Sequence, residues 1–276
     1  DYHLLEARDR FGGRIMGARV GEGVYDMGPA WFWPGQPRIA ALIARLGLRK
    51  FDQYATGDLC FEDESGRVQR GYGFASMEGS WRLEGGLRQL TDALTARVPQ
   101  TRRSLNAKVV RLENGPALCR AVLEDGRAYE AERVVLALPP RIAAGLTYSP
   151  ALPERATEAL VGFIGVPPAA RADEDRLKQA VEAQLVRLFG DEAAAPRALF
   201  IKDWAFDRLT ATAADAAPQL SHPAYGLPTA LRGLWDGRVI FAGTEVAASC
   251  GGYIEGALEA AEDAAAQLET AEVASL

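Results

Sequence analysis

The chain has 276 residues, of which 48% are hydrophobic and 25% charged, and its net charge is −6. It contains no basic block interleaved with aromatic residues, so nucleic acid is not an expected partner. No apolar run approaches the ~20 residues of a membrane-spanning helix, and only two histidines are present, so neither a membrane span nor a metal site is expected. Three cysteines without a CxxC pair indicate reduced thiols and a cytoplasmic location.

The chain opens on a short apolar stretch that predicts a buried strand. Residues 1–7 (DYHLLEA) carry an acid, Glu6, at the end of this strand, and Gly12 and Gly13 precede Arg14. A glycine pair lets the backbone approach an anion, which a guanidinium can bind in fork geometry. A solvated strand-end acid is the alternative for Glu6, and Arg8 is interpreted as a solvated charge.

Apolar periodicity predicts the elements that follow. Helical spacing predicts helices over 37–46, 87–98, 153–160 and 174–189, the last with Lys178 on its surface, and a helix from 254 onward. Turn-bounded runs predict short strands between 51 and 77, a β-meander over 107–133, and buried strands over 134–139 and 238–241. In the last helix the spacing leaves four acids to face water: Glu255, Glu259, Glu262 and Asp263.

A glycine joint connects the last strand to the last helix. Residues 250–253 read CGGY, so the helix would begin with free backbone N–H groups and no bulky side chain before them. Such a helix start suits an anionic ligand. A packed strand–turn–helix with a flexible glycine joint is the alternative.

Two long motifs resemble a known family. Residues 241–265 (FAGTEVAASCGGYIEGALEAAEDAA) and residues 4–15 (LLEARDRFGGRI), the latter followed by YDMGPAWFW at 25–33, are similar to signatures of the flavin-containing amine oxidases, the monoamine oxidase-like FAD-dependent oxidoreductases. The resemblance implies an α/β fold. A Rossmann-like FAD-binding domain would be built from discontinuous segments, with an α+β substrate domain inserted between them. The FAD-binding domain would comprise 1–51, 80–146 and 232–276, and the substrate domain 52–79 and 147–231.

The resemblance also implies site residues. Glu6 would hold the adenosine ribose, and Glu245 the ribityl–pyrophosphate region. Tyr253, Thr244 and Trp204 would be the catalytic residues, with Tyr253 as one wall of an aromatic cage beside the flavin. The cofactor-binding residues would be Glu6, Gly12, Gly13, Arg14, Gly28, Ala30, Val109, Gly243, Glu245, Gly252, Tyr253 and Ile254.

Three departures from the family pattern lead to further expectations. The sequence has no GxGxxG loop, so the polypeptide is expected to extend before Asp1 by about 30 residues. Extra residues are expected between Leu160 and Val161, where family members carry a lysine near flavin N5. Alanines lie near 213 and 214, where monoamine oxidases have a flavin-linking cysteine and a cage aromatic, so FAD is expected to be non-covalent. Tyr225 either replaces the lost ring or serves as packing.

The expected activity is FAD-dependent oxidation of an amine to an imine, with O2 reduced to H2O2. The expected partners are a small-molecule amine and O2, and a homodimer is left open. Two alternatives stay open as well. One is an enzyme of the same superfamily that acts on C–C bonds, such as a desaturase or a porphyrinogen oxidase. The other is a flavin-fold binding module without catalysis.

Overall fold

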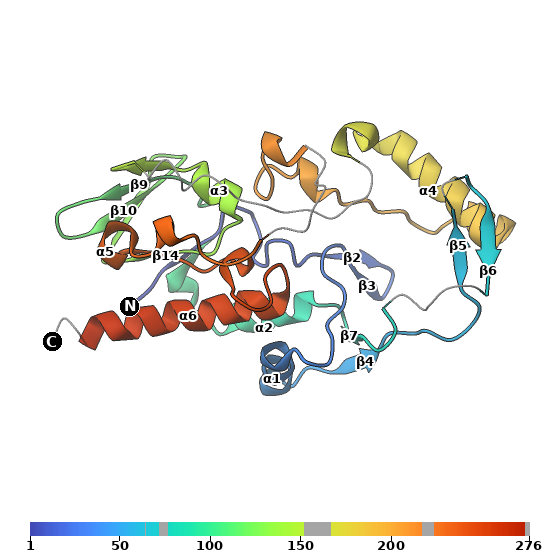
Figure 1. Cartoon of the computed structure of the whole chain (residues 1–276), viewed down its shortest axis with the longest axis horizontal. Helices are drawn as coiled ribbons and strands as arrows, with labels where there is room; N and C mark the ends of the chain where they lie inside the picture. Colours follow the sequence, from blue (N-terminus) through green and yellow to red (C-terminus); the bar gives the residue numbers. More distant parts are fainter. Residues whose placement is uncertain (64, 72–76, 152–166, 217–223, 274–276) are drawn as a thin grey trace.

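The computed structural model describes residues 1–63, 65–71, 77–151, 167–216 and 224–273 (Figure 1). Its helices are α1 (Pro37–Leu46), α2 (Arg88–Ala96), α3 (Pro140–Ala144), α4 (Glu174–Phe189), α5 (Leu234–Gly237) and α6 (Ile254–Val273). Its strands are β1 (Leu4–Leu5), β2 (Gly17–Val20), β3 (Gly23–Asp26), β4 (Lys50–Asp52), β5 (Cys60–Glu62), β6 (Val68–Arg70), β7 (Trp81–Leu83), β8 (Arg103–Ser104), β9 (Val109–Asn114), β10 (Cys119–Leu123), β11 (Ala128–Ala131), β12 (Val134–Leu136), β13 (Thr147–Ser149) and β14 (Val239–Phe241).

A parallel pair of strands carries the C-terminal motif. β12 and β14 pair in register from Val134 opposite Val239 to Leu136 opposite Phe241. Ile240 of β14 is buried against the small residues of α6, in a cluster with Ala264. The predicted strands at 134–139 and 238–241 and the predicted helix from 254 are therefore confirmed.

The predicted meander is also confirmed. β9, β10 and β11 pair antiparallel, and β13 adds a fourth strand parallel to β9. Their inner face shares a core with the β12–β14 pair through Leu112, Leu136 and Val239. At the N-terminus, β1 pairs parallel with β8 as a separate two-stranded sheet, and Leu5 of β1 packs against this core.

α1 packs on α2 and α6, and its ends follow local rules. Pro37 occupies the first turn, and Gly47 closes the helix in the left-handed region at φ 67°. Ile39, Leu42 and Ile43 form the buried face, which meets Leu87 and Leu90. The helix predicted over 37–46 is confirmed to the residue.

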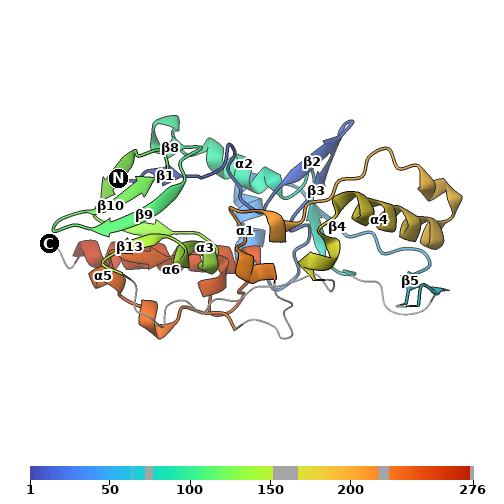
Figure 2. The same ribbon diagram turned by 90° about the horizontal axis from the view of Figure 1, so that it is seen from above.

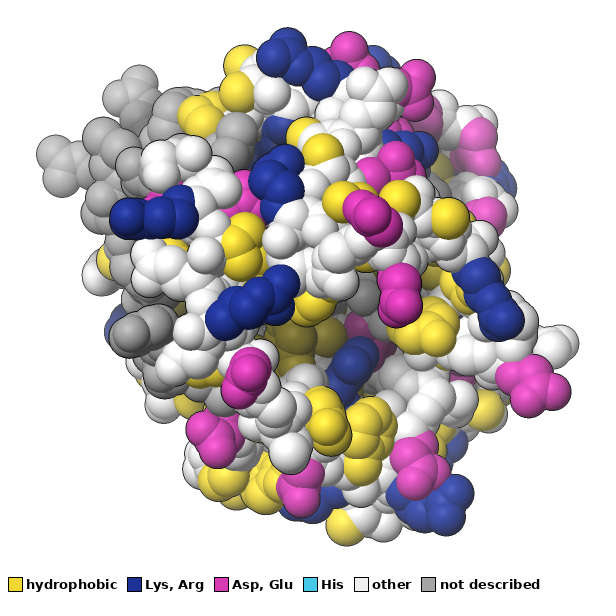
Figure 3. Space-filling view, turned by 90° about the vertical axis from the view of Figure 1, so that its right-hand side faces the viewer, with side chains coloured by type: hydrophobic (Ala, Val, Ile, Leu, Met, Phe, Trp, Pro, Cys, Tyr) yellow, Lys and Arg dark blue, Asp and Glu magenta, His cyan; other side chains and the backbone are white. Residues whose placement is uncertain are grey.

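α4 and the β5–β6 hairpin form the end of the molecule opposite both chain termini (Figure 2). The predicted helix over 174–189 is confirmed, and an ion pair between Arg187 and Glu62 at 2.6 Å ties it to β5. Lys178 lies on its surface and pairs with Glu174. Seen from this end, charged side chains of both signs surround a hollow with hydrophobic side chains in its depth (Figure 3).

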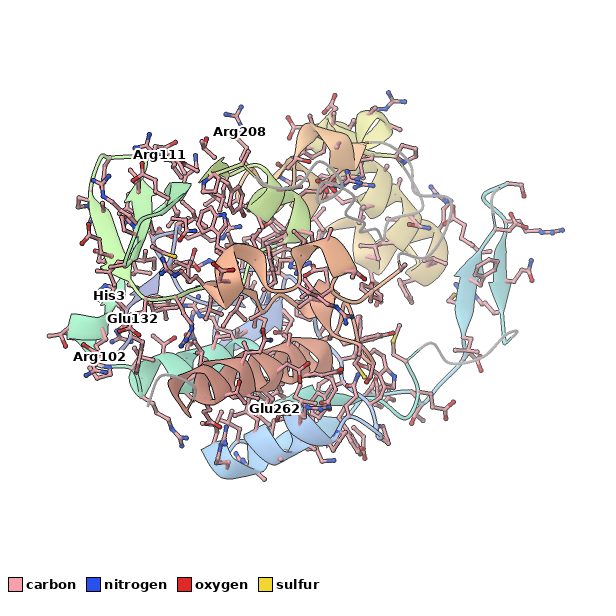
Figure 4. All side chains as sticks on the ribbon, turned by 60° about the vertical axis from the view of Figure 1, so that its left-hand side comes forward. His3, Arg102, Arg111, Glu132, Arg208 and Glu262 are labelled. Carbon is pink, nitrogen blue, oxygen red and sulfur yellow. The ribbon has the colours of Figure 1, made fainter. Side chains whose placement is uncertain are left out.

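The prediction that Glu255 and Glu259 face water is wrong. They are 1% and 5% exposed. Glu255 accepts hydrogen bonds from the backbone N–H groups of Arg38 and Ile39 at the start of α1. Glu259 accepts from the backbone N–H groups of 248 and 249. Backbone N–H groups that lack another acceptor thus take the place of water as hydrogen-bond donors to both carboxylates. Glu262 does face outward, beside α1 (Figure 4).

Three predictions are not tested by the structure. The helix predicted over 153–160 and the junction of Leu160 with Val161 fall outside the described residues, and the domain boundaries stay a prediction. In the part of the chain that the structure describes, none of the helices has the length and apolar character to cross a membrane.

Candidate functional site

Gly28 and Arg14 pack so closely that only glycine fits at position 28. A Cβ on Gly28 would lie 2.0 Å from the carbonyl oxygen of Arg14 and 3.8 Å from the ring of Trp204. The indole N–H of Trp204 donates to the carbonyl oxygen of Met27 (3.1 Å). Three segments that are far apart in the sequence therefore meet at Gly28.

Glu245 is a buried carboxylate with one oxygen free. It is 6% exposed, and its Oε1 accepts a hydrogen bond from the Arg14 guanidinium at 2.9 Å. Its Oε2 is buried and has no partner among the described residues. Because a buried acceptor without a hydrogen bond is destabilising, this oxygen fits a ligand that donates one. Gly243 leaves space beside this oxygen, since a Cβ at that position would lie only 3.1 Å from Oε2.

Internal hydrogen bonds fix the turn before α6. The hydroxyl of Thr244 donates to the carbonyl oxygen of Tyr253 at 2.6 Å, and Glu259 holds the backbone of 248 and 249. Thr244 is itself buried. Its hydroxyl therefore positions the backbone of Tyr253, and the predicted catalytic role of Thr244 stays a prediction.

Aromatic rings surround the glycine joint. Tyr253 is 50% exposed, and Trp33 meets it edge-on with ring centroids 6.1 Å apart. The ring of Tyr225 lies against Gly251 and Gly252, where an added Cβ would approach it to 2.1 and 2.4 Å. Burial, followed by the charge of Glu245 and by Tyr253, raises the pKa of Tyr225. A side chain at either glycine would therefore collide with Tyr225.

An ion cluster holds the segment that carries Trp204. The Arg8 guanidinium donates to both carboxylate oxygens of Asp207 (3.0 and 2.7 Å), and Lys202 donates to Asp207 at 2.6 Å. Burial by itself would raise the pKa of Asp207, but hydrogen bonds from Arg8 and Lys202 outweigh it and hold that pKa well below its usual range. The interpretation of Arg8 as a solvated charge is therefore wrong. By contrast Arg208, the next residue after Asp207, points away from the protein (Figure 4).

The other predicted site residues occupy separate positions in the N-terminal segment and in the core. Glu6 follows β1, where its Oε1 accepts from the N–H of Arg8, and its backbone bonds residue 107, two positions before Val109. Gly12 packs against Thr91, and Gly13 adopts φ 53° with open space at its Cβ position. Ala30 is buried and Ile254 packs on the α1–α2 core, so both are core positions.

Sequence patterns did not reveal three of these contacts. The Arg8–Asp207 pair spans 199 positions, and the packing of Trp33 on Tyr253 and of Tyr225 on the glycines also joins distant segments. No local spacing marks such contacts, because they form only when the segments fold together.

Comparison with known proteins gives one family over residues 1–268. The family model described as flavin containing amine oxidoreductase matches residues 1–71, 68–167 and 156–268. A probable flavin-containing monoamine oxidase A of Dictyostelium discoideum is 24% identical over 239 residues, which cover 64% of this chain and 51% of that protein. The chain therefore spans about half the length of this curated relative.

Solved structures show the same fold. Cyclohexylamine oxidase from Brevibacterium oxydans superposes with a TM-score of 0.77 at 17% identity, covering 98% of this chain and 94% of that one. A wild-type putrescine oxidase bound to putrescine superposes with a TM-score of 0.75 at 17% identity, covering 97% and 93%. The predicted α/β, Rossmann-like fold is thereby confirmed.

Proposed function

The chain belongs to the flavin-containing amine oxidoreductase family, and on that basis we propose that it oxidises a small amine with non-covalently bound FAD and O2. The observation that carries the proposal is the free, buried Oε2 of Glu245, whose other carboxylate oxygen is bound by Arg14. This is the arrangement expected of a site whose missing hydrogen bond comes from a bound ligand.

The residues present fit such a cofactor. Glu245 Oε2 would accept a hydrogen bond from a ribityl hydroxyl. The side chain of Arg14 is 35% exposed, so its remaining guanidinium N–H groups would be free to bind a phosphate. Glu6 would accept from the ribose diol with its remaining oxygen. The start of α6 at Ile254, directly after Gly252 and Tyr253, would add partial positive charge near the ring.

The chemistry that a flavin supplies when bound is transfer of a hydride equivalent from the carbon beside the amine nitrogen, and of two electrons onward to O2 to give H2O2. The protein orients the amine and excludes water. Tyr253 presents an exposed ring supported by Trp33, and Thr244 fixes the backbone from which that ring projects. The imine that results hydrolyses in water to an aldehyde or ketone.

Absence of a covalent link is part of the proposal. It is supported by the alanines at 213 and 214, which stand where a flavin-linking cysteine would be needed. Cell fractionation checks the proposed cytoplasmic location. Light scattering of the purified protein decides whether it forms a homodimer.

The test uses the purified full-length protein. Acid denaturation should release a flavin that chromatography identifies as FAD, and anaerobic addition of amines should bleach the flavin absorbance. Flavin that stays on the polypeptide would contradict the non-covalent link. A bound FAD that no primary amine reduces would contradict amine oxidation and favour an enzyme acting on C–C bonds. A protein that binds no flavin would favour the non-catalytic module.

A further inference from the structure

The ring of Tyr225 lies along both residues of the glycine joint. A Cβ on Gly251 would lie 2.5 Å from Cδ1 of Tyr225, and a Cβ on Gly252 would lie 3.0 Å from Cζ, with the hydroxyl oxygen closer still. The ring therefore runs from Gly251 to Gly252. It fills the space into which side chains at these two positions would project.

The joint itself is a four-residue turn. The carbonyl oxygen of Cys250 accepts a hydrogen bond from the N–H of Tyr253 at 3.2 Å, and Gly252, at the third position, has a φ of 83°. A positive φ at this position is typical of a type II turn. A type I turn keeps the same closing hydrogen bond but points its central peptide the opposite way. Glycine adopts both signs of φ about equally readily, so the closing bond alone does not fix the peptide between Gly251 and Gly252.

Hydrogen bonds hold the chain on both sides of this peptide. Glu259 holds the backbone just before the joint, and the Thr244 hydroxyl donates to the carbonyl oxygen of Tyr253 just after it. Among the described residues, the N–H groups of Gly251 and Gly252 have no acceptor. The orientation of the central peptide therefore depends on the aromatic ring packed along it, which a flip would have to displace.

Two unpaired groups indicate that a ligand meets this turn. Gly251 is a buried residue whose N–H has no acceptor among the described residues, and such groups are rare in folded proteins. Glu245 Oε2 is a buried acceptor that lacks a donor in the same part of the chain. The loop that carries Tyr225 is bound to Glu245 as well, since the N–H of Gly226 donates to its carbonyl oxygen at 2.9 Å. Tyr225 thus lies where both groups are positioned.

We propose that Tyr225 is a positioning residue of the flavin site: its ring keeps the Gly251–Gly252 peptide in one orientation and thereby sets the affinity for FAD. A backbone that already has its bound conformation binds more tightly, because less freedom is lost on binding. Burial, followed by the charge of Glu245, raises the pKa of Tyr225, so the phenol stays neutral beside that carboxylate. The inference rests on the proposed binding of FAD and adds a residue that prepares its site.

The test titrates FAD into the full-length protein from which flavin has been removed, and follows flavin fluorescence. Tyr225→Ala should raise the Kd about tenfold or more, because binding must then fix the turn. Tyr225→Phe keeps the ring and should stay within about twofold of wild type. Tyr54→Ala, a truncation of an exposed ring, is the control and should bind as wild type does. A wild-type protein that binds no FAD would contradict the proposed function itself.

A double variant tests the contact. Gly251→Ala places a Cβ against the ring and should also raise the Kd. In Tyr225→Ala/Gly251→Ala the collision is absent, so its Kd should be no higher than that of Tyr225→Ala alone. If the two substitutions instead multiply their effects on the Kd, they act independently and the proposal is wrong.

Other outcomes overturn the proposal while FAD binding stands. A Tyr225→Ala protein whose apoprotein melts at a lower temperature but whose Kd for FAD is that of wild type would show a role in stability only. A Tyr225→Phe protein as weak as Tyr225→Ala would show that the hydroxyl, and not the ring, is needed. Should Tyr225→Ala fail to fold, Tyr225→Leu and Gly251→Ala decide, since either one with the wild-type Kd overturns the proposal.

Discussion

Glu255, in α6, accepts a hydrogen bond at 2.9 Å from the backbone N–H of Ile39, near the start of α1, although 216 positions separate the two residues. The same carboxylate also accepts from the N–H of Arg38. The first N–H groups of a helix have no partner within it, so a residue of the C-terminal motif caps the first helix of the chain.

We expect Glu255→Ala to lower the free energy of unfolding by about 2–4 kcal/mol, because two buried N–H groups lose their acceptor. Glu255→Gln keeps one acceptor oxygen and should lower it less. Urea denaturation measures both. Glu262→Ala is the control, since Glu262 is an exposed acid of the same helix, 63% accessible. Equal effects of Glu255→Ala and Glu262→Ala would contradict the capping role.

We expect Gly28→Ala to be poorly soluble or to lose more than about 3 kcal/mol of stability, because its Cβ would collide with the backbone of Arg14, which cannot move as a side-chain tip can. Gly21→Ala is the matched control. Gly21, unlike Gly28, has a positive φ of 56°, and its Cβ would meet open space, so only about 1–2 kcal/mol of conformational strain is expected. Thermal melting of both variants distinguishes collision from strain.

We expect Asp207→Asn to lower stability by about 1–3 kcal/mol at pH 7, since two charge-assisted hydrogen-bond partners lose their anion. The folded-state pKa of Asp207 is depressed, so its contribution is fully present above the unfolded pKa of about 4 and is lost as the pH falls through the folded pKa. The difference between wild type and variant should therefore be constant from pH 7 to 5 and shrink below about pH 4. Denaturation curves over this range check it, and a difference that grew on acidification would refute it.

Local sequence patterns were sufficient to predict those helices and strands whose ends and buried faces are set by nearby residues. α1 was predicted to the residue because Pro37, the apolar face and Gly47 all lie within it or next to it. The meander and the β12 and β14 strands followed from apolar runs and turn residues in the same way.

The same patterns misplaced residues whose partners are distant. Glu255 and Glu259 look like solvent-facing helix positions, and only the arrival of α1 and of the 248–249 backbone makes burial favourable. Arg8 was misjudged for the same reason, because Asp207 lies 199 positions away. Such contacts depend on tertiary packing, which charge and periodicity alone do not encode.

The last prediction concerns Tyr253 as a wall of the substrate pocket. Its ring is half exposed, while its backbone is fixed by Thr244 and its edge by Trp33, so it is held in place and still accessible. Tyr253→Phe keeps the ring and should change turnover only modestly. Tyr253→Ala should raise KM and lower kcat by about tenfold or more with FAD content unchanged, because the amine loses a surface that orients it and excludes water.

Steady-state kinetics with flavin content determined from the absorbance spectrum measure these effects, and Tyr54→Ala, a truncation of a 78% exposed ring, is the control. If Tyr253→Ala loses its flavin or its fold while Tyr253→Phe behaves as wild type, the ring serves packing of the glycine joint. In that case Tyr225, which already covers Gly251 and Gly252, and Trp204, which packs on Gly28, become the residues to test as pocket walls.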